Sequence, residues 1–83
     1  MISAESAEVL QRSEEIYRNR LKEILEPTHR GEFVAIEPDS GDYYLGKKMI
    51  DVMLACQAAH PDRLSHIMRV GFPAAVEIGY AHP

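Results

Sequence analysis

Three acidic residues, Glu37, Asp39 and Asp42, fall within a ten-residue stretch that also carries Pro38 and Gly41. Carboxylates this close together can bind a hard cation such as calcium or magnesium, although the alternating ligands and distant glutamate of a calcium-binding hand are absent. Proline, two short polar residues and glycine, in this order, are typical of a four-residue hairpin loop. The stretch therefore predicts a tight turn, with a weak divalent cation site as the alternative.

Histidine and cysteine are the other residue types here that could do chemistry. His29, His60, His66 and His82 show no metal-binding helical spacing. His60 and His66 follow each other closely, at a helix end and on the next strand, and we expect both to be partly buried structural rings. The alternative is a pair that binds metal or relays protons. Cys56 falls on the apolar side of a helix, where a cysteine packs as a small hydrophobe and is no nucleophile.

Catalysis is not expected from this sequence. No nucleophile, base and orienting residue can be assembled into one site. The run from Gly41 through Gly46 and Lys47 approaches a phosphate-binding loop, but Lys48 stands where Ser or Thr must hold magnesium. We predict no enzyme activity, no catalytic residue, no cofactor and no metal ligand.

Composition indicates an ordinary globular protein. The chain has 83 residues with a net charge of −4, and we expect one α+β domain over residues 1–83. The basic residues form no stripe, so nucleic-acid binding is not expected. There is no apolar run of membrane-spanning length, the first residues are acidic and unlike a signal peptide, and the one cysteine excludes a disulfide framework. We therefore expect a cytoplasmic protein.

The chemistry-bearing residues must be positioned by a small set of predicted elements. These are a long helix at 3–26 ended by Pro27 and partly projecting, strands at 32–37 and 42–46, a helix at 47–60, and strands at 63–72 and 74–80. The expected core face of the second helix consists of Met49, Val52, Met53, Cys56 and His60. The order is α-β-β-α-β-β, with both helices expected on one face of a small sheet.

Several apolar residues fall where such a fold would leave them uncovered. Ile50 and Leu54 lie outside the core face of the second helix. The first helix is about 36 Å long while a strand spans about 17–20 Å, so Leu10 and Ile16 also need cover. Either the two helices pack on each other or a partner covers them, and the sequence leaves both open. We predict a symmetric homodimer, with these four residues near the interface.

Four short motifs resemble those of a group of short, uncharacterised bacterial proteins. They are an EEIY-type motif within the first helix at 14–17, an EP-x-H-x-G-x-FV run at 26–34, an SGDY-type hairpin at 40–43 and an R-V-G-F-P run at 69–73. The ββαβ order is also similar, at the level of pattern, to HicB-type antitoxins. The resemblance implies a protein-binding module, in the form of an antitoxin-like regulator of a partner encoded nearby. The alternative is a small-ligand or metal-binding module that uses the hairpin acids with His60 and His66.

Overall fold

The structure is a computed structural model and describes residues 4–72. Its elements follow in order as α1 (Ala4–Ile16), the π-helical segment η1 (Tyr17–Leu21), α2 (Lys22–His29), β1 (Phe33–Glu37), β2 (Asp42–Gly46), α3 (Met49–Ala59) and β3 (His66–Arg69). The predicted α+β class is confirmed. The predicted third strand is shorter than 63–72, and the strand predicted at 74–80 lies outside the described residues.

Strand β1 is the centre of the sheet, whose strand order is β2-β1-β3. It runs antiparallel to both neighbours, with Phe33 opposite Gly46 on β2 and opposite Arg69 on β3. β2 and β3 are therefore parallel to each other, and α3 connects them. A connection between parallel strands of one sheet has to cross one of its faces.

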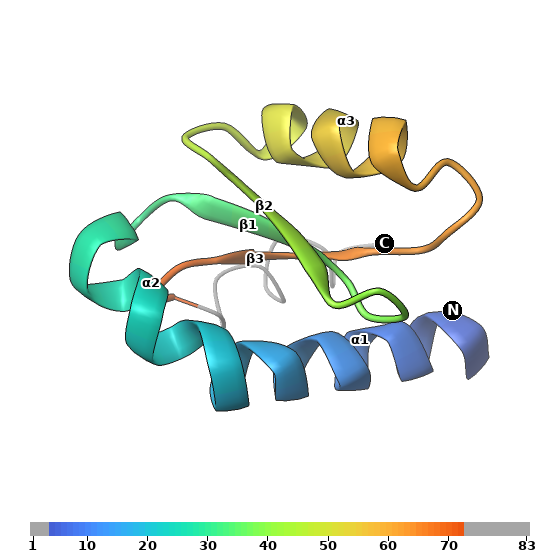
Figure 1. The fold of residues 1–83 in the computed structure, drawn as a ribbon, viewed down its shortest axis with the longest axis horizontal. Helices are drawn as coiled ribbons and strands as arrows, with labels where there is room; N and C mark the ends of the chain where they lie inside the picture. The colour runs from blue at the N-terminus through green and yellow to red at the C-terminus, as the bar shows by residue number, and fades with distance from the viewer. Residues whose placement is uncertain (1–3, 73–83) are drawn as a thin grey trace, which may run out of the picture.

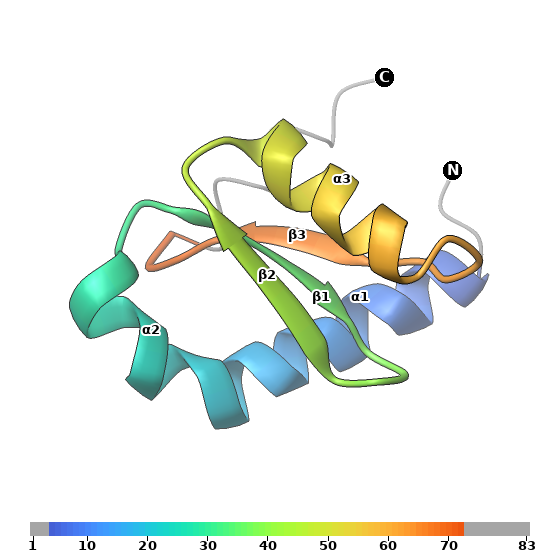
Figure 2. The ribbon, with the colours of Figure 1, turned by 45° about the horizontal axis from the view of Figure 1, so that its top comes forward.

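Elements α1, η1 and α2 follow one another without a break and are called the N-terminal helix below. The N-terminal helix lies on one face of this sheet and α3 lies on the other, as Figure 1 and Figure 2 show. The prediction that both helices share one face is therefore wrong. Successive side chains of a strand point to opposite faces, and β1 is apolar on both. Val34 and Ile36 pack towards the N-terminal helix, while Ala35 and Phe33 pack towards α3. The N-terminal helix already covers one face, so α3 crosses the other.

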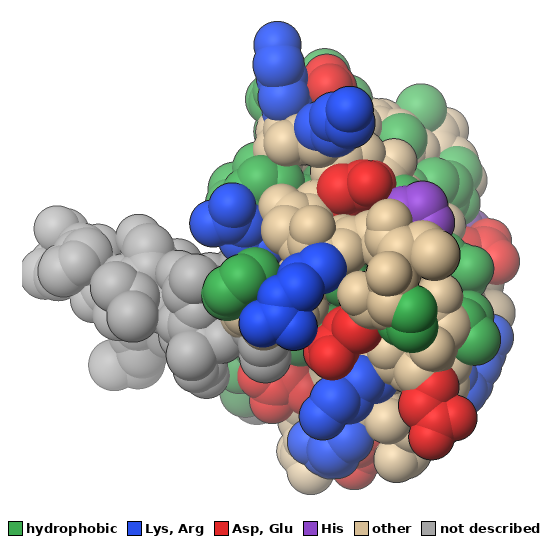
Figure 3. Space-filling view, turned by 90° about the vertical axis from the view of Figure 1, so that its left-hand side faces the viewer, with side chains coloured by type: hydrophobic (Ala, Val, Ile, Leu, Met, Phe, Trp, Pro, Cys, Tyr) green, Lys and Arg blue, Asp and Glu red, His purple; other side chains and the backbone are tan. Residues whose placement is uncertain are grey.

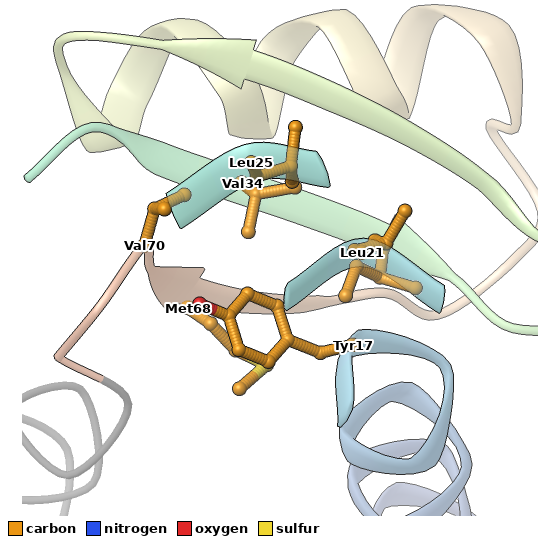
Figure 4. Packing of buried hydrophobic residues seen from close by; sticks show 7 residues of the cluster. Tyr17, Leu21, Leu25, Val34, Met68 and Val70 are labelled. Carbon is orange, nitrogen blue, oxygen red and sulfur yellow. The ribbon is translucent and has the colours of Figure 1, made fainter. Parts of the chain in front are cut away.

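The two faces carry cores of different size. The larger core lies between the N-terminal helix and the sheet and contains Tyr17, Leu21, Leu25, Val34, Ile36, Met68 and Val70 (Figure 4). The smaller core contains Ala35, Val52 and Cys56, with Phe33, Tyr44 and Ile67 at its edge. Helix α3 therefore contributes two buried side chains, and most of its surface lies outside the core.

The N-terminal helix continues beyond the predicted stop at Pro27 and ends at His29. A proline inside a helix lacks the N–H that would bond the carbonyl four residues earlier, here that of Glu23. Pro27 and Glu23 are both exposed, so water can solvate that carbonyl. The proline is tolerated because its cost falls on the solvent side of the helix.

A π-helical turn within this helix determines which residues reach the core. In η1 the N–H of Lys22 donates to the carbonyl oxygen of Tyr17, one residue further back than in an α-helix. The wider turn brings residues spaced four apart onto one face. Leu25 is consequently buried while Ile24, which the regular 3.6-residue period predicts to face inward, is 58% exposed.

The β1–β2 hairpin forms at the predicted position, with the turn at 38–41. The N–H of Gly41 donates to the carbonyl oxygen of Glu37 at 2.9 Å. Gly41 has a φ of 79°, in the left-handed region that side chains with a Cβ rarely adopt. A Cβ at this position would also lie 3.0 Å from Nη1 of Arg20.

Replacement of Gly41 by Ala should lower the free energy of unfolding by about 1 kcal/mol or more, because of its backbone conformation. Gly41→Asn should cost less, since asparagine tolerates the left-handed region better than alanine. Urea unfolding followed by circular dichroism measures both values. Equal losses in the two variants would contradict backbone strain as the cause.

Urea unfolding of the wild type with and without calcium or magnesium tests the cation alternative. That alternative predicts a large metal-dependent rise in the urea concentration at the unfolding midpoint.

Candidate functional site

Glu37 is a buried carboxylate at the end of β1, and its side chain is bonded to the hairpin turn. The residue is 1% exposed. Its Oε2 accepts a hydrogen bond from the N–H of Asp39 at 2.8 Å, and its Oε1 accepts one from the N–H of Ser40 at 2.9 Å. Burial alone would raise the pKa of Glu37, but the hydrogen bonds from Ser40 and Asp39 outweigh it and lower that pKa. Glu37 therefore acts as an ionised cap of the turn.

Asp39 connects the turn to two other parts of the chain. Arg12 of α1 donates to its Oδ1 at 2.7 Å, and Arg63 of the α3–β3 loop donates to its Oδ2. Arg12 also donates to the carbonyl oxygen of Pro38. The hydrogen bond from Arg12, together with the charges of both arginines, lowers the pKa of Asp39. Because the group is exposed, these contacts orient the turn more than they stabilise it.

Asp42, the third hairpin acid, lies beside His60 at the end of α3. Nε2 of His60 is 3.0 Å from Oδ2 of Asp42, and its Nδ1 is 3.8 Å from Oε1 of Glu37. The ring also meets Tyr44 edge-on, with centroids 6.2 Å apart. The half-buried ring of His60 thus lies between two carboxylates. The sequence predicted the turn and the helix end separately but not this contact.

His66 does not join His60 at this place. It lies on β3 opposite Ile36, which belongs to the core on the side of the N-terminal helix. Side chains of directly opposed residues lie on the same face of a sheet. His60 lies on the other side of the sheet, where α3 packs. Within residues 4–72, no group of three or more His, Cys, Asp or Glu side chains is arranged to hold a metal ion.

Cys56 is buried in the smaller core, so its predicted role as a small apolar residue is confirmed. Burial raises the pKa of its thiol, although a hydrogen bond with Ser65 opposes the shift. A raised pKa disfavours the thiolate, which is the nucleophilic form of cysteine. This thiol therefore lacks the environment of a reactive cysteine.

The hydroxyl of Tyr17 joins three of the motifs that carry the resemblance. It donates to Oε2 of Glu26 at 2.7 Å and accepts from the N–H of Gly71 at 3.0 Å. Burial, together with the bond to Glu26, raises the pKa of Tyr17. These three motif residues thus connect the N-terminal helix to the end of β3. The occurrence of Tyr17, Glu26 and Gly71 in these motifs was the only signal for this contact in the sequence. In the structure, these residues form a hydrogen-bonded contact.

The four predicted interface residues do not form one surface. Ile50 and Leu54 are 49% and 51% exposed on α3. Leu10 and Ile16 are half-buried on the other side of the sheet, where Ile16 packs against the larger core. Ile16 also borders a shallow groove between α1 and the hairpin turn. The possibility that the two helices cover each other is excluded, because the sheet separates them.

Helix α3 presents large apolar side chains to solvent. We define the outer α3 surface as its four large apolar side chains that are exposed, Met49, Ile50, Met53 and Leu54. Met49 and Met53 were predicted to be in the core, but only Val52 and Cys56 of that predicted face are buried. The reason is that a sheet covers one side of a helix, and this helix is apolar nearly all round. Asp51 is its one charged residue.

Comparison of the chain with protein-family models, with curated proteins and with solved structures finds no match. The resemblance to short bacterial proteins and to HicB-type antitoxins therefore stays a prediction. Among residues 4–72, no helix has the length and apolar character needed to cross a membrane.

Removal of the Tyr17 hydroxyl by Tyr17→Phe should lower the free energy of unfolding by about 1–3 kcal/mol, since it leaves the Gly71 N–H and the Glu26 carboxylate without their partner. Tyr43→Phe is the matched control, because Tyr43 packs against the same core and makes no hydroxyl hydrogen bond within the described residues. Its effect should stay within about 0.5 kcal/mol. Denaturant unfolding measures both, and equal losses would show that the hydroxyl contact is unimportant.

Acid should destabilise the protein through the hairpin acids. The ordinary pKa values of Glu37 and Asp39 are 4.5 and 3.8, and folding lowers both. Their contribution is therefore fully present above these values and is lost as the pH falls through the lower folded-state values. The difference in unfolding free energy between the wild type and Glu37→Gln should be largest near pH 6 and shrink towards pH 2. A difference that grows on acidification would contradict this assignment.

Proposed function

We propose that this protein is a small protein-binding module and that it associates through the outer α3 surface. The observation that carries the proposal is the exposure of four large apolar side chains, between 39% and 51%, on one short helix. A helix that is apolar all round is normally covered on every side. Contiguous exposed apolar surface of this kind marks interaction sites in soluble proteins.

A second copy of the chain is the occupant we propose, which gives a symmetric homodimer. Leu54 lies near the middle of α3, so two antiparallel copies related by a twofold axis at Leu54 would bring Ile50 of each opposite Ala58 of the other. The small alanine allows close approach. The same arrangement brings the end with Lys47 and Lys48 towards the end with Asp62, and no described residue pairs with these three charges. Shape and charge are thus self-complementary.

The more specific form of the proposal rests on the resemblance described above. It is an antitoxin-like regulator that binds a partner protein encoded nearby, in the cytoplasm. The geometry supports association over ligand binding, because the hairpin acids are engaged with the turn, with two arginines and with His60. The small-ligand alternative has no comparable observation in its favour.

Sedimentation equilibrium over a wide concentration range tests the homodimer. The wild type should be dimeric at micromolar concentration. Leu54→Glu should raise the dimer dissociation constant at least about a hundredfold, because burial of each leucine contributes about 1.5–3 kcal/mol and the change occurs twice in a symmetric interface.

Ile24→Glu is the matched control for this experiment. It introduces the same charge at an exposed apolar residue of α2, on the other side of the sheet, and should leave the dimer intact. A monomeric mass for the wild type at high micromolar concentration would refute the homodimer. Dissociation by Ile24→Glu with no effect of Leu54→Glu would instead refute the outer α3 surface as the interface.

A further inference from the structure

Two arginines and two phenylalanines are stacked at the end of the sheet where β1 begins and β3 ends. Cζ of Arg30 lies 4.9 Å from the ring centroid of Phe72, and Cζ of Arg69 lies 5.3 Å from the same centroid. Arg69 also lies 5.7 Å from the ring of Phe33, its cross-strand neighbour. We name Arg30, Arg69 and Phe72 the arginine stack. Figure 3 looks onto this end of the molecule, where basic side chains lie beside apolar ones.

A backbone hydrogen bond anchors Arg69, and the side chain of Arg30 lies close to Gly71. Nε of Arg69 donates to the carbonyl oxygen of Gly31 at 3.1 Å, which leaves its two terminal nitrogens for other partners. Arg30 crosses Gly71, and a Cβ at Gly71 would lie 3.0 Å from Cγ of Arg30. Gly71 also has a φ of 82°. Stacked and anchored guanidinium groups lose less conformational entropy when they bind than free side chains do.

Neither arginine of the stack forms an ion pair with a described residue. The nearby acids of the same segment are engaged elsewhere, Glu26 with Tyr17 and Glu32 with His29. Two other arginines of this protein show the contrasting arrangement, because they share the carboxylate of Asp39. Arg18 and Arg20 also lack an ion pair with a described residue, and stacking against an aromatic ring is what distinguishes Arg30 and Arg69 from them within residues 4–72.

We propose that the arginine stack binds an acidic segment of a partner protein, with Arg30 and Arg69 holding Asp or Glu carboxylates. The planar guanidinium group matches a carboxylate with two parallel hydrogen bonds. Arginine and aromatic residues are also the side chains most enriched at the centres of protein interfaces.

An acidic protein segment fits this surface better than a nucleic acid does. Affinity for nucleic acid depends on many phosphate contacts along a basic surface, and the net charge of this protein is −4. Few cations are gathered here, so this surface matches one or two carboxylates and not a long run of phosphates. The stack is a second binding surface in addition to the outer α3 surface, so either can fail without the other.

Fluorescence anisotropy with a fluorescein-labelled deca-glutamate peptide tests the proposal, with deca-glutamine and a ten-nucleotide oligothymidylate as the comparison probes. The wild type should bind deca-glutamate, less strongly as salt increases, and should not bind deca-glutamine. The double variant Arg30→Ala/Arg69→Ala should weaken binding about tenfold, since each exposed ion pair contributes up to about 1 kcal/mol. Leu54→Glu should leave it unchanged.

Arg18→Ala/Lys22→Ala is the matched control, because it removes the same charge from exposed positions of the N-terminal helix. It should weaken binding no more than about twofold. Equal weakening by the two double variants would overturn the proposal, as would no binding of deca-glutamate. Tighter, stack-dependent binding of the oligonucleotide would overturn it in favour of nucleic acid. If the alanine variant does not fold, Arg30→Lys/Arg69→Lys tests the stack, and it should still weaken binding by loss of the fork.

Discussion

Burial of the central strand on both faces is the constraint on which the described structure depends. Val34, Ala35 and Ile36 of β1 are fully buried. A strand of this kind needs a layer on each side, and residues 4–72 supply one helical segment for each. The N-terminal helix covers the face of Val34 and Ile36, and α3 covers the face of Ala35. In this chain of 83 residues, the part from 4 to 72 contains no further helix or strand that could cover the outer sides of these helices.

The acidic stretch that most resembles a chemical site serves this architecture. Glu37 ends the buried strand and bonds the turn that follows it. Asp39 is shared by arginines from α1 and from the α3–β3 loop, and Asp42 meets His60 at the end of α3. The three carboxylates thus hold together both helical layers and the hairpin. Each of the three carboxylates therefore has partners within residues 4–72.

The surface carries two features that packing inside the monomer does not explain. Helix α3 places two side chains in the core but carries four more large apolar ones outside. The arginine stack holds two guanidinium groups in fixed positions, without an ion pair to any described residue. Exposed apolar area costs free energy in an isolated chain, and exposed guanidinium groups remain available to bind carboxylates. Association with another protein would cover the first and pair the second.

Local patterns alone were enough to predict the α+β class, the hairpin with Gly41 at its left-handed position, the positions of the helices and the burial of Cys56. Each of these depends on neighbouring residues, through turn conformation or side-chain periodicity. Four other features depended on the packed chain. They are the face covered by α3, the inward rotation of Leu25, the contact of His60 with Asp42 and the arginine stack. Alternation along β1 shows that both faces are apolar, but which helix covers which face depends on the β2–β3 crossover. The π-helical turn breaks the regular 3.6-residue period, which would turn Ile24 inward in place of Leu25. Contacts between residues far apart in the chain exist only once the sheet brings its strands together, and no local pattern encodes them.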